Sequence, residues 1–398
     1  MLRAPAEEIH MKPIIDMPVL DTDTHIVEPA DLWTSRISTR KWGDKVLHVK
    51  WDPRKKLDYW FIGDKAVFSA WGCANWGWKG GPMSIPPKFE DTQPACWDAN
   101  ARLREMDACG IRAAVLYPNL GAVLMGMYAK MGIPELMLAS VQAYNDWLID
   151  WISVAPNRFV PTACLPLWSV EETVLEIQRA TKLGHKALVM SCAPHEHGWP
   201  YLGDRVWDPV WAAARDSGLP ISFHAGGGDI GDSFLSPERF RIYGIEANYV
   251  RHSSVTFLDN SVQMCDLLMS GVPARYPELK FALVESGLGH VPFTLESLDY
   301  HFKIARLDKA RPEFKKLPSE YFRDQVYVNY WFEKFDGFYL ERLGADNIMF
   351  ETDFPHTTCL GGTKVREAIR NGLNLSPVEV QEKILWRNAA RLYNVDMS

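Results

Sequence analysis

The chain has 398 residues, of which 47% are hydrophobic and 23% are charged, a composition typical of a globular protein with a large core. Its net charge of -7 comes without a long basic run, so we expect neither a nucleic acid nor a membrane surface as a partner. The seven cysteines are scattered, and no stretch of about 18 uncharged apolar residues occurs. These features favour a cytoplasmic protein without a disulfide framework, a signal peptide or a membrane span.

The first predicted strand ends in two candidate metal ligands. The run 21–29 reads DTDTHIVEP and places Asp23 and His25 two residues apart. Side chains of a strand alternate between its faces, so these two face the same side. A carboxylate and an imidazole that converge at a strand end suit zinc, iron or manganese. Glu28, just beyond, could contact the metal or the substrate, or instead cap a helix or form a loop salt bridge.

A long aromatic-rich segment follows at residues 30–97. It is too long for an ordinary loop between a strand and a helix. We predict an insertion that forms a lid or a pocket wall, in which Trp76 and Trp78 contact the substrate. An aromatic lining favours a bulky apolar or aromatic small molecule. The same rings could instead form a satellite core or a subunit interface.

Short β-rich runs alternate with helical segments along the whole chain. The predicted strands are 19–23, 112–117, 159–164, 187–191, 220–224, 281–285, 325–330 and 348–353. The helical segments between them include 99–109, 134–154, 170–183, 206–217, 261–269 and 291–305. This alternation predicts an α/β fold with one domain, residues 1–398, built as a (β/α)8 TIM barrel. A doubly wound open sheet is the alternative, but no Gly-rich phosphate loop follows the first strand.

Three later strands also end in residues that could bind a metal. His224, Glu285 and Asp353 close the fifth, sixth and eighth predicted strands, and His290 follows in the sequence after Glu285. The active site of a TIM barrel lies at the carboxyl ends of its strands. We therefore expect these residues to meet the first-strand pair at one site. The extra Glu and His side chains also leave room for a second metal ion.

The pattern resembles the amidohydrolase superfamily, in the branch that contains aminocarboxymuconate semialdehyde decarboxylase and the dihydroxybenzoate decarboxylases. The likeness runs from residue 19 to residue 395 and includes the segment NAARLYN at 388–394, which is similar to the last helix of that branch. Proteins with this appearance are commonly dimers, so the resemblance implies a homodimer.

The resemblance also implies roles for particular residues. Asp23, His25 and His224 match the metal ligands of the branch, and Asp353 matches the acid that both contacts the metal and handles protons. His356 matches a position that the family keeps, and it would either pack beneath the site or orient the substrate.

One position departs from the decarboxylases. Their sixth strand ends in a histidine, whereas this chain has Glu285 there, in the run FALVESGLGH. The site is therefore richer in carboxylate, and Glu285 becomes both a candidate ligand and, with Asp353 and His290, a candidate catalytic residue.

We expect a hydrolase or a non-oxidative decarboxylase of a hydrophobic or aromatic carbonyl or carboxylate compound. One divalent metal would serve either reaction, zinc first, with manganese or iron as the other choices. Two alternatives stay open: a diiron oxygenase that uses the carboxylate-rich site for hydroxylation, and a metal-binding protein without catalysis.

Overall fold

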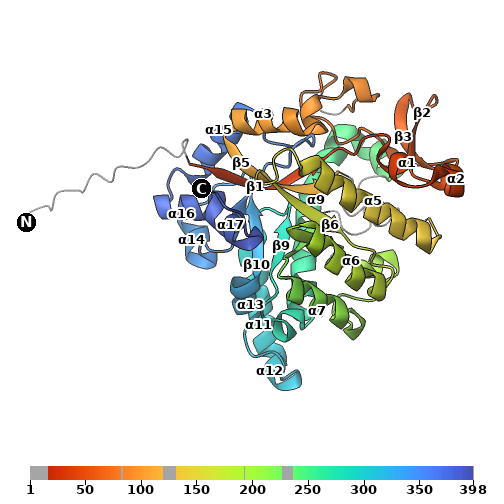
Figure 1. Cartoon of the computed structure of the whole chain (residues 1–398). Helices are drawn as coiled ribbons and strands as arrows, with labels where there is room; N and C mark the ends of the chain where they lie inside the picture. The colour runs from red at the N-terminus through yellow and green to blue at the C-terminus, as the bar shows by residue number, and fades with distance from the viewer. Residues whose placement is uncertain (1–16, 82–83, 120–130, 192, 226–235, 398) are drawn as a thin grey trace, which may run out of the picture.

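The structure is a computed structural model that describes residues 17–81, 84–119, 131–191, 193–225 and 236–397. Its centre is an eight-stranded sheet in which each pair of hydrogen-bonded neighbours is parallel and follows chain order (Figure 1). The strands are β1 (Val19–Ile26), β5 (Ile111–Pro118), β6 (Phe159–Cys164), β7 (Ala187–Met190), β8 (Ile221–His224), β9 (Phe281–Val284), β10 (Val326–Tyr330) and β11 (Ile348–Phe350).

The sheet closes between its last and first strands. A parallel bridge joins Thr24 to Phe354, just after β11, and the N–H of Asp353 donates to the carbonyl oxygen of Asp23 at 3.0 Å. The N–H of His25 donates in turn to the carbonyl oxygen of Phe354 at 2.6 Å. The (β/α)8 barrel predicted from the sequence is therefore confirmed. Its strands are buried along their length apart from Arg112, as expected for parallel strands covered by helices.

Helices surround the strands (Figure 1). Their ends follow ordinary capping chemistry: the Asp98 side chain accepts from the N–H of Ala101 at the start of α3, and Gly110 ends that helix in the left-handed conformation. The principal helices are α3 (Ala99–Cys109), α5 (Pro134–Ile152), α6 (Val170–Leu183), α7 (Asp208–Ser217), α9 (Pro237–Met269), α11 (Val291–Ala305), α13 (Pro318–Gln325), α14 (Gly337–Leu343), α15 (Thr363–Leu373), α16 (Val378–Glu382) and α17 (Asn388–Tyr393).

Two helices differ from the prediction. The segment 261–269 is only the last part of α9, which begins at Pro237 and contains a break at Gly244. Polar residues occur all along this helix, so its sequence lacks the single apolar stripe that marks a surface helix. The segment predicted from residue 206 starts as a 3-10 turn, Arg205–Trp207, before α7.

The segment between β1 and α3 contains short helices, α1 (Leu32–Arg36) and α2 (Thr39–Trp42), and an antiparallel sheet of β2 (His48–Asp52), β3 (Leu57–Ile62) and β4 (Lys65–Ser69). Trp33, Trp60 and Trp71 are buried and lie in a chain of ring contacts, with centroids 5.0 and 6.5 Å apart. The Trp33 indole donates to the carbonyl oxygen of Ser140 on α5 at 3.0 Å. These three rings form a core that fastens the insertion to the barrel.

A helix crosses a bilayer only when it is both long and apolar, and none of the helices in the described part of the chain meets both conditions.

Candidate metal centre

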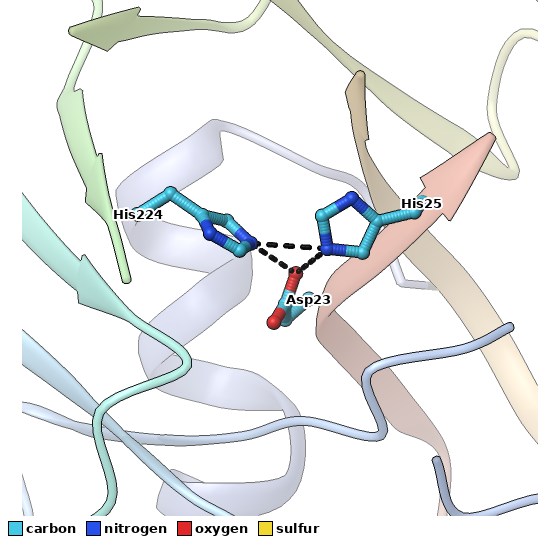
Figure 2. Close-up of side chains that lie close together, drawn as sticks. All are labelled: Asp23, His25 and His224. Carbon is cyan, nitrogen blue, oxygen red and sulfur yellow. Dashed lines mark hydrogen bonds and ion pairs between the residues drawn. The ribbon is translucent and has the colours of Figure 1, made fainter. Parts of the chain in front are cut away.

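Two barrel strands bring a carboxylate and two imidazoles together (Figure 2). Asp23 and His25 project from β1, and His224 is the last residue of β8. The Nε2 atoms of the two histidines lie 3.0 Å apart. Asp23 Oδ1 lies 3.3 Å from Nε2 of His224 and 3.4 Å from Nε2 of His25. These three side chains are buried, so water competes weakly for their donor atoms.

The donor set fits a divalent ion. Each histidine places Nδ1 2.9 Å from a backbone carbonyl oxygen, that of Pro118 for His25 and that of Ala225 for His224. Nδ1 then holds the ring proton, and Nε2 presents a lone pair to the centre. Lone pairs that face one another repel unless a cation or a proton lies between them. The ligand atoms lie about 3.0–3.4 Å apart. This is the separation expected when each atom is bonded to one central ion at about 2.0–2.2 Å.

Asp353 extends this cluster from the strand next to β1. It follows β11 with a backbone φ of 56°. Its Oδ1 lies 3.6 Å from Nε2 of His25 and 2.7 Å from Nδ1 of His356, while Oδ2 accepts from the hydroxyl of Thr358 at 2.7 Å. The His356 ring stacks on the His25 ring, with centroids 4.0 Å apart. Asp353 therefore joins the two imidazoles with a carboxylate whose orientation is fixed.

Glu285 lies next to the cluster. It follows β9, also at positive φ, and its Oε2 is 3.6 Å from Nδ1 of His224. Three overlapping groups of possible ligands result: Asp23, His25 and His224; His25, Asp353 and His356; and Asp23, Glu285 and Asp353. Within each group the ligand atoms lie within 4.8 Å of one another.

The electrostatics show the effect of burying acids and bases together. Burial opposes the charged form of His224, but Asp23, Glu285 and the Ala225 carbonyl oxygen together outweigh burial and raise the pKa of His224 to about 9. Burial, reinforced by His356, lowers the pKa of His25 to about 4. Burial also raises the pKa of Glu285 to about 8, with a further contribution from Asp353. A divalent ion at the centre would replace the protons that these groups otherwise share.

Two buried acids beneath the site were missed in the sequence. The Glu351 carboxylate accepts from the backbone N–H of Glu285 at 3.0 Å and from the Asn329 amide, which holds Glu285 in place. Asp21 accepts from the N–H and the hydroxyl of Thr352. Both acids precede a candidate ligand by two residues, so the alternation that identified Asp23 could have found them.

The remaining predicted residues lie elsewhere. His290 precedes α11 and belongs to none of the three ligand groups among the described residues; burial lowers its pKa to about 4. The Glu28 carboxylate accepts from the N–H of Asn119 at 3.0 Å. Trp76 packs on Phe354, with centroids 5.7 Å apart. The Trp78 indole donates to Ser84 at 2.8 Å.

A cavity of about 470 Å³ opens above Asp353, Glu285 and His356. One wall is a face of α9, a second wall comes from the insertion, and a third comes from the loop after β11. Neither Glu28, Trp76 nor Trp78 is among the described residues that line it. The lining from the insertion instead comes from Lys55, Tyr59, Val67, Phe68, Ser69, Gly72, Cys73, Asn75 and Ile85.

Comparison with known proteins gives the family. Residues 20–395 match the model of the family described as Amidohydrolase, and the chain belongs to that family. The gamma-resorcylate decarboxylase of Polaromonas sp. is 25% identical over 312 residues, which are 74% of this chain and 87% of that protein. The 2-amino-3-carboxymuconate-6-semialdehyde decarboxylase of Dictyostelium discoideum is 22% identical over 325 residues, 79% of this chain and 82% of that protein. The resemblance predicted from the sequence is confirmed.

Solved structures share the fold. An amidohydrolase from Mycobacterium avium subsp. paratuberculosis has a TM-score of 0.73 at 22% identity, covering 95% of this chain and 99% of that one. A 5-carboxyvanillate decarboxylase from Novosphingobium aromaticivorans, with bound manganese and 3-methoxy-4-hydroxy-5-nitrobenzoic acid, has a TM-score of 0.65 at 18% identity, covering 95% of this chain and 97% of that one.

Proposed function

We propose that this protein is a metal-dependent, non-oxidative decarboxylase of an aromatic carboxylate. One divalent ion would be bound by Asp23, His25, His224 and Asp353. The observation that carries the proposal is the overlap of two ligand groups, which share His25 and together contain these four side chains. Asp353 also lines a cavity of about 470 Å³, within the usual size range of small-molecule sites. The names of the decarboxylases that match most of the chain support the same reaction class.

A divalent ion supplies a Lewis acid for the substrate carboxylate and a neighbouring oxygen. In the reaction a proton adds to the ring carbon, the bond to the carboxylate carbon breaks, its electron pair returns to the ring, and carbon dioxide leaves. Asp353 is placed to hold that proton, because Thr358 fixes one of its oxygens and His356 lies 2.7 Å from the other. Phe257 and Trp331 line the cavity as apolar surfaces that would pack against the ring.

The ligand set is compatible with several metals. Two imidazoles and two carboxylates suit zinc, manganese and iron. The Novosphingobium enzyme, which has the same fold, contains bound manganese, and this supports manganese as a candidate metal here. We therefore include manganese beside the zinc expected from the sequence.

The test of this function is incubation of the manganese-loaded protein with a panel of dihydroxybenzoates in deuterated water. The proposal predicts release of carbon dioxide and incorporation of one deuterium at the carbon that carried the carboxylate. The Asp353→Asn variant should lose both signals. The exposed His301→Ala variant, a control outside the three groups of possible ligands, should keep them. Cleavage of ester or lactone probes without release of carbon dioxide would instead indicate a hydrolase.

Glu285 favours a second candidate, a diiron oxygenase. The resemblance implies a histidine at this position in the decarboxylases, and Glu285 forms a group of three possible carboxylate ligands with Asp23 and Asp353. Carboxylate oxygens are hard ligands, and sites that hold two irons use several of them. Two irons per chain together with oxygen consumption would favour this alternative.

A further inference from the structure

The wall of the cavity combines acidic, basic and apolar side chains. Asp353, Glu285 and His356, which belong to the groups of possible metal ligands, line one part of it. Lys55 and Tyr59, from the hairpin of β2 and β3, also line the cavity. Apolar side chains supply other parts of its wall: Val67, Phe68, Ile85, Phe257 and Trp331. A volume of about 470 Å³ lies within the range of about 300–1,000 Å³ that small-molecule sites have.

The backbone at Lys55 is held by its own turn. The Asp52 carboxylate accepts from the N–H groups of Arg54 and Lys55, at 2.9 and 3.3 Å. The N–H of Lys56 donates to the Asp52 carbonyl oxygen at 2.8 Å. Asp52 is buried, so these bonds are protected from water and fix the position from which the Lys55 side chain extends.

The Lys55 ammonium contacts the Tyr59 side chain. Its Nζ lies 4.2 Å from the Tyr59 ring centroid and donates to the Tyr59 hydroxyl at 3.1 Å. Within the described part of the chain it forms no ion pair with a carboxylate, whereas the neighbouring Arg54 is paired with Asp52 at 3.7 Å. A cation in the wall of a cavity attracts anions even in a protein with a net charge of -7.

We propose that Lys55 and Tyr59 form a remote anion subsite, which binds a second acidic group of an extended substrate. The substrate would then be a dianion in which an apolar body separates two acidic ends. One end would react at the metal centre, and the other would accept hydrogen bonds from the Lys55 ammonium and the Tyr59 hydroxyl. This inference rests on the proposed function for the substrate end that reacts at the metal centre. The acidic group at the other end of the substrate is inferred from the residues that line the cavity.

The test measures binding rather than turnover. Isothermal titration calorimetry compares two probes on the manganese-loaded protein: biphenyl carrying one terminal carboxylate and biphenyl carrying a carboxylate at each end. An exposed charge pair contributes about 0.2–1 kcal/mol, so we expect the dicarboxylate to bind up to about fivefold more tightly. The preference should fall as the salt concentration rises. It should vanish in Lys55→Gln and reverse in Lys55→Glu.

Lys56→Gln is the matched control. It removes the same charge from the next residue, which does not line the cavity among the described residues, and it should keep the preference. Equal affinity for the two probes, failure of the dicarboxylate to bind, or a preference that survives Lys55→Gln would each overturn the subsite. A preference that depends on Lys55, without release of carbon dioxide from any acid, would support the subsite and contradict the proposed reaction.

Discussion

The backbone N–H of Asp353 donates to the carbonyl oxygen of Asp23 at 3.0 Å, and this bond helps close the barrel between β11 and β1. The same two residues carry carboxylates of the candidate metal centre. Closure of the barrel therefore brings these two candidate ligands together. A metal bound at this seam would also join β1 to β8 through His224 and so stabilise the folded state.

Replacement of His224 by Ala should empty the metal centre. It removes one of two imidazoles and leaves Asp23 with a single imidazole beside it. Loss of a residue that only hydrogen-bonds to a metal ligand lowers metal affinity by about 10–100-fold. Loss of a ligand should cost more, so we expect manganese affinity to fall at least about 100-fold. Equilibrium dialysis with elemental analysis measures the change, and His301→Ala is the control. Unchanged affinity would remove His224 from the ligand set.

Asp353→Asn should separate metal binding from proton transfer. The amide keeps the size of the side chain and a carbonyl oxygen, but it cannot hold the transferred proton. We expect kcat to fall by about 10²–10⁴, with metal content close to that of the wild type. Steady-state kinetics beside elemental analysis provide the readout. An undiminished kcat would exclude Asp353 as the proton donor.

Arg102→Gln should destabilise the fold and disturb the site. The buried guanidinium donates to the carbonyl oxygens of His25 and Ala95, each at 2.7 Å, and stacks on Phe354 at 4.3 Å. Its loss leaves buried carbonyl groups unpaired at a cost of about 2–4 kcal/mol in the free energy of unfolding. Urea denaturation measures this cost.

The exposed Arg104 lies on the same helix, so Arg104→Gln is the matched control for Arg102→Gln. It should change the free energy of unfolding by less than about 0.5 kcal/mol. Equal stability of the two variants would show that Arg102 does not hold the end of β1.

His185 should make stability depend on pH. Burial lowers its pKa from 6.5 to about 4, and its Nε2 lies 3.2 Å from the Asn145 carbonyl oxygen. Between pH 6.5 and 4 the unfolded chain binds a proton that the folded chain does not, so the free energy of unfolding falls as the pH falls. The largest effect is about 3 kcal/mol, at about 1.4 kcal/mol per pKa unit.

Urea denaturation at several pH values gives the His185 contribution as the difference between the wild type and His185→Gln. The variant should lose part of the decline in stability below pH 6.5. Identical pH profiles of the two proteins would contradict the assignment.

Residue alternation and strand ends predicted much of the barrel and the residues that meet at its candidate metal centre. Asp23, His25, His224 and Asp353 were predictable because parallel strands bring their carboxyl ends together, whatever the loops do. Their roles as ligands, and that of Glu285, stay predictions. The expected homodimer and cytoplasmic location also stay predictions.

The insertion was less predictable, because the direction of each tryptophan depends on its tertiary partners. Trp76 packs on Phe354 as its own backbone N–H donates to Pro355. His290 follows a turn after β9 rather than the strand itself, so alternation no longer fixes its direction. The β2–β4 sheet pairs locally, and its sequence does not indicate which face meets the barrel.

The most direct test of a one-metal decarboxylase is the metal content of protein purified without added metal, measured by elemental mass spectrometry for the wild type and for Glu285→Gln. We predict about one manganese or zinc per chain in both proteins, because the proposed ligand set of Asp23, His25, His224 and Asp353 does not include Glu285. About two irons per chain in the wild type, reduced to one or none in Glu285→Gln, would contradict this account and indicate an oxygenase.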